Sequence, residues 1–231
     1  MNTRLALLLS LPLATAALLL LGNSARAGDP AAAPAPTTAT AHSYTLNSSS
    51  SELYVQVFKD PTTLAAGLSH DHVVVATGWT GTVDWDTADV SHCKVSISVP
   101  VSKLVNDETS MRQKVGYTTT LDDGQRAEVK GHMMDASQLN ASSFASITFN
   151  STGCVASGDK VNVTGNLSIH GVQKSVTVAM KVTATATDFS ASTLFNMSHT
   201  DFGISPFSAL AGSLKNKNEM TFVVKAKGTV K

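Results

Sequence analysis

The chain has little charge, few aromatic side chains and no excess of either charge sign. Charged residues make up 15% and aromatic residues 6% of its 231 positions, and the formal net charge at pH 7 is +0. Nucleic-acid binding depends on a concentration of basic side chains, so this composition predicts no nucleic-acid partner. Hydrophobic residues still account for 42% of the chain, which is enough for a packed core.

The motifs of common enzyme classes are also absent. The sequence has no G-x-S-x-G nucleophile elbow, no phosphate-binding loop, no H-E-x-x-H zinc motif and no dinucleotide fingerprint. Residues 201–203 form the triplet Asp-Phe-Gly, but no other feature of a protein kinase accompanies it. We therefore predict that the protein is not an enzyme and has no catalytic residues.

Residues 1–27 have the three parts of a secretory signal peptide. Arg4 supplies the positive start, an apolar run follows over 5–21, and Ala25-Arg26-Ala27 matches an A-x-A cleavage site. This pattern predicts export to the periplasm, cleavage before Gly28 and no stable membrane insertion afterwards.

Two further segments follow the expected cleavage site. Residues 28–43 are rich in alanine, proline and threonine and predict a disordered leader. Residues 44–231 then form a single domain, with structure beginning near Tyr44.

Only two cysteines, Cys93 and Cys154, are present. Cys93 begins the strand-like segment 93–101 and Cys154 ends the segment 147–154, so antiparallel pairing would bring them together. In an oxidising compartment this arrangement predicts a disulfide, although two free, buried thiols are the alternative. A redox pair is not indicated, because the C-x-x-C spacing is missing.

Period-two alternation of apolar and polar residues dominates the rest of the sequence, which is typical of strands with one buried face. The clearest segments are 93–101, 161–170, 176–186 and 220–230, and the weaker ones are 52–59, 72–85, 146–153 and 194–202. Only 102–145 departs from this pattern, and it predicts one or two short helices. Asp107 or Asn106 could cap the first and Thr120 the second.

About eight antiparallel strands must hide their edges, and closure into a barrel does so completely. We therefore predict an all-β, eight-stranded antiparallel barrel of the lipocalin-like kind. An eight-stranded barrel is either filled by its own side chains or holds one small ligand. The many small apolar residues and few aromatics favour a hollow interior, although a two-sheet sandwich could use the same faces.

Four motifs in order resemble the YceI-like family. The segment 160–174, KVNVTGNLSIHGVQK, is similar to the family's "G-[DN]-L-[ST]-[IL]-H-G-V" stretch. SHDHVVVATGWTGTV at 69–83, FASITFNST at 144–152 and SHTDFGISPFSALAGSL at 198–214 resemble three further family segments. The resemblance covers about residues 44–230. It implies an exported lipocalin-like barrel that binds polyisoprenoids or other long-chain amphiphiles.

The side chains on the apolar strand faces are the candidate lining of a ligand pocket. They include Trp79, which shares the odd-numbered face of 72–85 with Val75 and could form a wall for an apolar ligand. The full candidate set is Val75, Trp79, Ile97, Val99, Phe149, Leu167, Val178, Met180, Val182, Ala184, Phe222 and Val224.

His70 and His72 are the most enzyme-like feature of the sequence. Residues i and i+2 of a strand share a face, so both imidazoles could hold one metal ion, with a distant residue such as His199 as a third ligand. We favour the alternative that both are polar residues at the pocket mouth, because no third ligand follows at a suitable spacing.

Together these observations predict binding, sequestration or transport of an isoprenoid-like or other long-chain apolar ligand inside the barrel. The partner is then an apolar small molecule, and no cofactor is expected beyond a bound lipid or isoprenoid. An exported metal-binding protein or metalloenzyme using His70 and His72 is the alternative. The sequence leaves open the identity of the ligand and whether the protein forms a homodimer.

Overall fold

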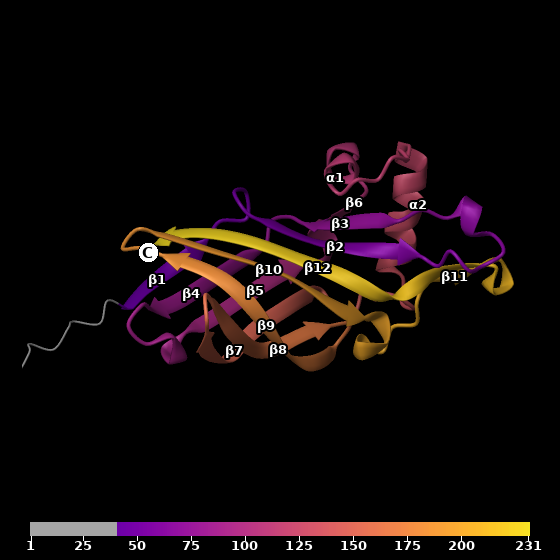
Figure 1. Ribbon diagram of the computed structural model, residues 1–231. Coiled ribbons are helices and arrows are strands. Elements are labelled where there is room, and N and C mark those ends of the chain that lie inside the picture. Colours follow the sequence, from indigo (N-terminus) through magenta and orange to yellow (C-terminus); the bar gives the residue numbers. More distant parts are fainter. Residues whose placement is uncertain (1–40) are drawn as a thin grey trace, which may run out of the picture. The chain divides into compact units, whose positions relative to one another are not determined.

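The computed structural model describes residues 41–231 (Figure 1). The signal peptide expected at 1–27, and residues 28–40 of the expected leader, lie outside the described part of the chain. Residues 41–43 belong to the first strand rather than to the leader, because they pair with residues 84–86 of a neighbouring strand. The folded domain therefore begins at Ala41, slightly before Tyr44.

The described residues are mostly strands, with two short α-helices. The strands are β1 (Ala41–Leu46), β2 (Glu52–Lys59), β3 (His72–Ala76), β4 (Thr80–Asp86), β5 (Lys94–Pro100), β6 (Leu104–Asn106), β7 (Ser146–Ser157), β8 (Lys160–Ile169), β9 (Val172–Ala184), β10 (Asp188–Ser198), β11 (Ser208–Ala209) and β12 (Leu214–Val230). The helices are α1 (Thr109–Lys114) and α2 (Asp123–Met134). None of the helices in residues 41–231 combines the length and apolar character needed to cross a bilayer.

Eight strands close into an antiparallel barrel, as the sequence predicts. The ring runs β1-β4-β5-β7-β8-β9-β10-β12 and closes where residues 44–46 of β1 pair with residues 228–230 of β12. The strands β2, β3 and β6 prolong three members of this ring. Both β1 and β2 pair with β12, β3 pairs with β2 and β6, and β4 pairs with β1 and β5. Each of β1–β2, β3–β4 and β5–β6 is thus one long strand with an irregular step in the middle.

The two helices lie in the connection between β6 and β7, within the segment 102–145 that the sequence marks as helical. Their caps differ from the expected ones. Asp122, not Thr120, caps α2 through a capping box with Gln125. Glu108 precedes α1, and Asp107 has a different role, described below.

Cys93 and Cys154 form the predicted disulfide, with their Cα atoms 6.0 Å apart. Cys93 directly precedes β5, and Cys154 lies in the neighbouring strand β7. The bond spans 61 positions of sequence, and a loop of that length corresponds to a stabilisation of about 4 kcal/mol in the chain-entropy model.

Candidate ligand-binding cavity

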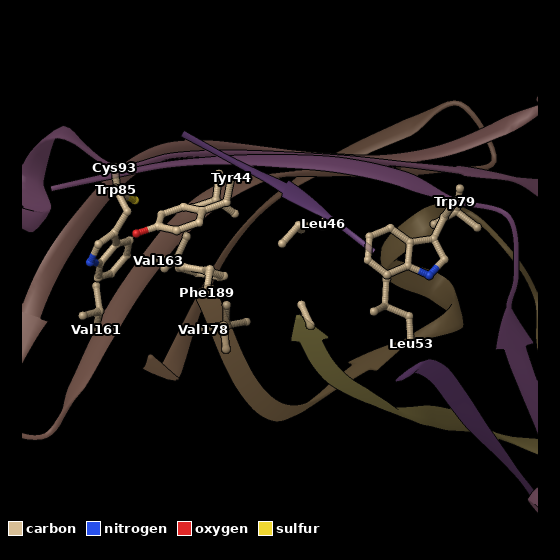
Figure 2. Packing of buried hydrophobic residues seen from close by; sticks show 14 of the residues in the cluster. Tyr44, Leu46, Leu53, Trp79, Trp85, Cys93, Val161, Val163, Val178 and Phe189 are labelled. Carbon is tan, nitrogen blue, oxygen red and sulfur yellow. The ribbon is translucent and has the colours of Figure 1, made fainter. Parts of the chain in front are cut away.

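One half of the barrel is filled by its own side chains. Tyr44 packs on Phe189 with ring centroids 5.3 Å apart, and Trp85 meets the same Phe189 ring edge-on at 5.8 Å. The Tyr44 hydroxyl donates a hydrogen bond to the Thr185 carbonyl at 2.5 Å. Figure 2 shows these rings together, near Cys93 and Val161. We call this half, which includes the disulfide, the filled end.

The other half of the barrel is hollow. It encloses a cavity of about 310 Å³, within the range of about 300–1,000 Å³ that is typical of small-molecule sites. Its wall is almost entirely apolar, and its few polar side chains include His132 of α2, Gln138, His199 and Asn216. We call this the helix-covered end. The principal lining residues are Leu53, Val55, Val57, Val74, Ala76, Val95, Ile97, Val99, Leu104, Val129, Met133, Leu139, Ile147, Phe149, Leu167, Ile169, Val176, Val178, Met180, Phe195, Ile204, Phe207, Met220, Phe222 and Val224.

Eight of the twelve predicted lining residues lie on this cavity wall. They are Ile97, Val99, Phe149, Leu167, Val178, Met180, Phe222 and Val224. The strands that carry them are regular, so the alternation read from the sequence places their apolar faces inward. Whether these residues bind a ligand stays a prediction.

Val182 and Ala184 also face inward but do not line the cavity. In the register of β9 and β10, Ala184 lies opposite Phe189 and Val182 opposite the buried Ala191. They therefore belong to the filled end. Period-two alternation identifies the inner face of a strand, but it carries no information about position along the barrel axis.

Val75 lies on the wrong face and Trp79 is buried outside the cavity wall. In β3 the cavity-lining residues have even numbers, His72, Val74 and Ala76. A break at residues 77–79, where Gly78 has φ +56°, inserts an extra residue before β4. The inner face is therefore even-numbered before the break and odd-numbered after it. Figure 2 shows Trp79 beside Leu53, apart from the aromatic group at the filled end.

Several lining residues come from elements that contribute nothing to the predicted lining set. Phe195 of β10 stacks on Phe222 of β12, with ring centroids 5.2 Å apart and nearly parallel planes. Val129 and Met133 of α2 close the cavity from the helix side. Their spacing of four places them on one face of the helix, which is the signal that could have identified them.

His72 connects the cavity wall to a buried charge network. Its Nδ1 lies 2.7 Å from Oδ2 of Asp107, while Oδ1 of Asp107 accepts a hydrogen bond from Arg112 at 2.7 Å. The Val73 amide donates to the same carboxylate at 3.1 Å. Burial alone would raise the pKa of Asp107, but the hydrogen bonds and charge of these partners hold it below its ordinary value.

Arg112 is almost completely buried, and each nitrogen of its guanidinium donates at least one hydrogen bond. Besides Asp107, it donates to the carbonyls of Asp71 and Thr119 and to the Thr119 hydroxyl, all at 2.7 Å. The Tyr117 ring lies 5.3 Å beneath its guanidinium. The network fixes the ring of His72, with Nδ1 on Asp107, and leaves Nε2 as the nitrogen available on the cavity side.

Two further histidines line the helix-covered end, whereas His70 does not line the cavity. His199 donates from Nδ1 to the Asn218 carbonyl at 2.9 Å, and burial lowers the pKa of this imidazole. The His132 ring packs on Phe207 at 4.8 Å. Partial burial, together with the neighbouring His72, Arg112 and Lys59, lowers the pKa of His70.

The structure gives no support to a metal site built on His70 and His72. His72 already contacts Asp107 through Nδ1, and His70 lies outside the cavity wall. Within residues 41–231, no group of three or more His, Cys, Asp or Glu side chains is placed to hold a metal ion. The alternative function as a metalloprotein therefore gains no argument from the geometry.

A closed eight-stranded antiparallel barrel with an apolar cavity at one end defines the class of lipocalin-like barrels, whose architecture fits a binding protein. The model of the YceI-like domain matches residues 44–226. The chain belongs to this family.

Similar proteins are found both among known sequences and among solved structures. Protein YceI of Salmonella arizonae and that of Salmonella newport are each 35% identical over 79 residues, or 33% of this chain. The chain spans only 41% of the length of these relatives. The crystal structure of Burkholderia cenocepacia BcnA has a TM-score of 0.59 at 16% identity, covering 79% of this chain and 98% of that one. This likeness shows the shared fold. A Campylobacter jejuni YCEI protein has a TM-score of 0.49 at 14% identity, covering 68% of this chain and 84% of that one.

Proposed function

We propose that the protein holds one elongated apolar molecule, an isoprenoid-like or fatty amphiphile, in the cavity and sequesters or carries it in the periplasm without chemical change. The observation that carries the proposal is the cavity of about 310 Å³ with its nearly continuous apolar wall. The cavity lining lacks partner atoms when empty, and a hydrocarbon chain would supply them. Each CH₂ group transferred from water contributes about 0.8 kcal/mol, so a long chain can offset the cost of its own immobilisation.

The polar groups at the helix-covered end suit the head group of such an amphiphile. His72 is held by Asp107 and keeps Nε2 for a hydrogen bond on the cavity side. His199 presents the ring edge opposite to the one that donates to Asn218. A ligand with its tail in the barrel and its hydroxyl or ketone group at this end would satisfy both parts of the site. No other cofactor is needed.

Export is the second part of the proposal. It is supported by the signal-peptide pattern of residues 1–27 and by the disulfide, since disulfides persist in oxidising compartments. We expect N-terminal sequencing of protein from a periplasmic extract to begin at Gly28. Protein that is found only in the cytoplasm and still begins at Met1 would contradict export.

A charge placed on the cavity wall tests the binding function. Met180 lines the cavity, whereas Lys181 is the next residue of β9 and lies exposed on the outer face. Met180→Glu should abolish binding, because an unpaired carboxylate in an apolar cavity is costly. Lys181→Glu introduces the same group outside and should bind normally.

The readout is native mass spectrometry of purified protein, followed by organic extraction and titration with isoprenoid and fatty ligands. We expect one ligand per barrel, whether the protein is a monomer or a homodimer. Wild-type protein that carries no lipid and takes up no isoprenoid or fatty ligand would refute the carrier function. Equal binding by the two variants would refute the assignment of the cavity as the site.

A further inference from the structure

Three leucine side chains project into solvent from two loops at the helix-covered end. Leu64 and Leu68 lie in the loop between β2 and β3 and are 96% and 71% exposed. Leu210 lies between β11 and β12 and is 60% exposed. We call these three residues and their loops, residues 60–71 and 205–213, the leucine tip.

The two loops form one surface. The Asp60 amide donates to the Lys215 carbonyl, and the Ala65 amide donates to the Ser213 carbonyl, both at 2.8 Å. Figure 1 shows the first loop beside the loop that follows β11, at the end of the barrel opposite the C-terminus. The leucines are therefore neighbours on a shared projection rather than isolated surface residues.

The second loop adopts a strained backbone where it presents its leucine. Leu210 has φ +50° and Ala211 has φ +52°. These values lie in the left-handed region, which residues other than glycine, asparagine and aspartate rarely adopt. Such strain costs free energy and is concentrated at functional sites. A leucine held outward in this conformation gains nothing from the protein's own core.

The charge around the leucine tip is positive. Lys59, Lys215 and Lys217 flank the two loops, while Asp60 and Asp71 stand at the two ends of the first loop, so lysines outnumber acidic residues by three to two. Exposed aliphatic side chains surrounded by lysines are typical of segments that dock on anionic bilayers. Protein-protein hot spots favour Trp, Tyr and Arg, and residues 60–71 and 205–213 contain none of these.

The leucine tip is continuous with the wall of the cavity. Val57 and His72 stand on either side of the first loop, Phe207 lies within the second loop and Asn216 follows it, and all four line the cavity. A partner bound to the leucine tip would therefore lie close to this end of the cavity.

We propose that the leucine tip docks reversibly on the surface of an anionic lipid bilayer, where the cavity exchanges its ligand with the membrane. The docking follows from the exposed leucines and the lysines. The exchange rests on the proposed carrier function. In this docked state only side chains of the two loops enter the bilayer, and the chain does not cross it.

Vesicle binding tests the docking with full-length exported protein. The variant Leu64→Ser, Leu68→Ser, Leu210→Ser removes the apolar contacts. The matched control is Val155→Ser, Leu194→Ser, because these residues are 65% and 64% exposed on the barrel wall, in β7 and β10. Circular dichroism and thermal unfolding check that both variants fold like wild type, as expected for exposed positions.

The assay is co-sedimentation with vesicles of phosphatidylethanolamine and phosphatidylglycerol, compared with vesicles of phosphatidylcholine. Wild type and control should prefer the anionic vesicles, and this preference should weaken with salt. The triple variant should bind about tenfold or more weakly. Equal sedimentation of wild type and triple variant, or no vesicle binding by wild type, would overturn the docking. So would leucine-dependent self-association that leaves vesicle binding unaffected by the substitutions.

A second measurement separates docking from ligand binding. Isoprenoid alcohol added from ethanol should bind the triple variant as it binds wild type, while transfer of the same alcohol out of vesicles should slow by about tenfold or more. Wild type that docks on vesicles but binds no isoprenoid or fatty ligand would refute the carrier function and leave the docking intact. Normal transfer by the triple variant would refute the role of the tip in exchange.

Discussion

Asp107 is the residue on which the charge network of the helix-covered end converges. Its carboxylate accepts from Arg112, from the Val73 amide and from the His72 ring, and its side chain is fully buried. It also has φ +53°, a conformation that aspartate tolerates better than most residues. A buried charge pair is strongly destabilising when one partner is removed, because the other charge stays without compensation.

Arg112→Met should therefore destabilise the protein by about 3–5 kcal/mol, since it leaves the Asp107 carboxylate buried with fewer partners. Urea unfolding followed by tryptophan fluorescence measures the change. Arg126→Met is the control, because Arg126 pairs with Asp123 at the surface, and we expect little effect. Similar losses in both variants would show that the buried network is not what stabilises this region.

Asp107 also gives the stability a dependence on acid pH. Its pKa lies below the ordinary value of 3.8, so its contribution is complete above that value and is lost as the pH falls through the lowered pKa. Wild-type stability should therefore drop steeply below about pH 4. Asp107→Asn should be less stable at neutral pH but show a flatter curve in this acid range. Parallel curves would contradict the assignment.

The sequence could not predict this network. Asp107 follows a strand and precedes a helix, which is the pattern of a helix cap. The sequence around it does not indicate Arg112 or His72 as partners of its carboxylate. The contact with His72 joins residues 35 positions apart and depends on how β3 packs against the segment after β6. Local patterns identify which residues can carry charge, whereas the fold decides which charges meet.

At the scale of elements, regular strands follow their sequence pattern and irregular ones do not. Alternation predicts the inner faces of β5, β8, β9 and β12, all of which contain predicted lining residues. The alternation fails across residues 77–79, where one extra residue changes the inward-facing positions from even numbers in β3 to odd numbers in β4. A glycine in a long apolar strand was the available signal, since glycine often marks a bulge.

Gly165 of β8 leaves room for the Phe149 ring of the neighbouring strand β7. A Cβ atom there would overlap the Phe149 ring and come within 2.7 Å of the Asn150 carbonyl oxygen. Gly165→Ala should cost about 1–3 kcal/mol through overpacking and should weaken ligand binding, because the displaced Phe149 ring lines the cavity. Thermal unfolding and isoprenoid titration measure the two effects.

Gly153 of β7 provides the matched control. Nothing lies within 4 Å of a Cβ atom at that position, so Gly153→Ala should leave both stability and binding nearly unchanged. If the two substitutions behave alike, the contact between Phe149 and Gly165 is not important.

The whole molecule divides into a filled end and a hollow end along one barrel. The aromatic group of Tyr44, Trp85 and Phe189 occupies the filled end, and the cavity lies toward α2. Composition alone favours a hollow barrel, but it cannot place the three rings at one end. That division is set by register between strands, so alternation alone does not distinguish Val182 and Ala184 from the residues that line the cavity.

The division into a filled end and a hollow end predicts opposite effects on stability for a valine-to-leucine substitution at the two ends. Val224 and Val182 are both half-buried valines on inner strand faces, but only Val224 lines the cavity. Val224→Leu should stabilise ligand-free protein, because the added methylene gains contacts in a space that lacked them, and it should weaken ligand binding. Val182→Leu should overpack the filled end and destabilise by about 1–3 kcal/mol, with binding unchanged.

Delipidated protein is required for this comparison, since a ligand that binds only the folded state raises its apparent stability. Thermal unfolding before and after addition of isoprenoid alcohol then reports both quantities for each variant. The ligand-induced rise in Tm should shrink in Val224→Leu and stay at the wild-type size in Val182→Leu. Two stability changes of the same sign would contradict the division of the barrel, because one packing environment would then extend along its whole length.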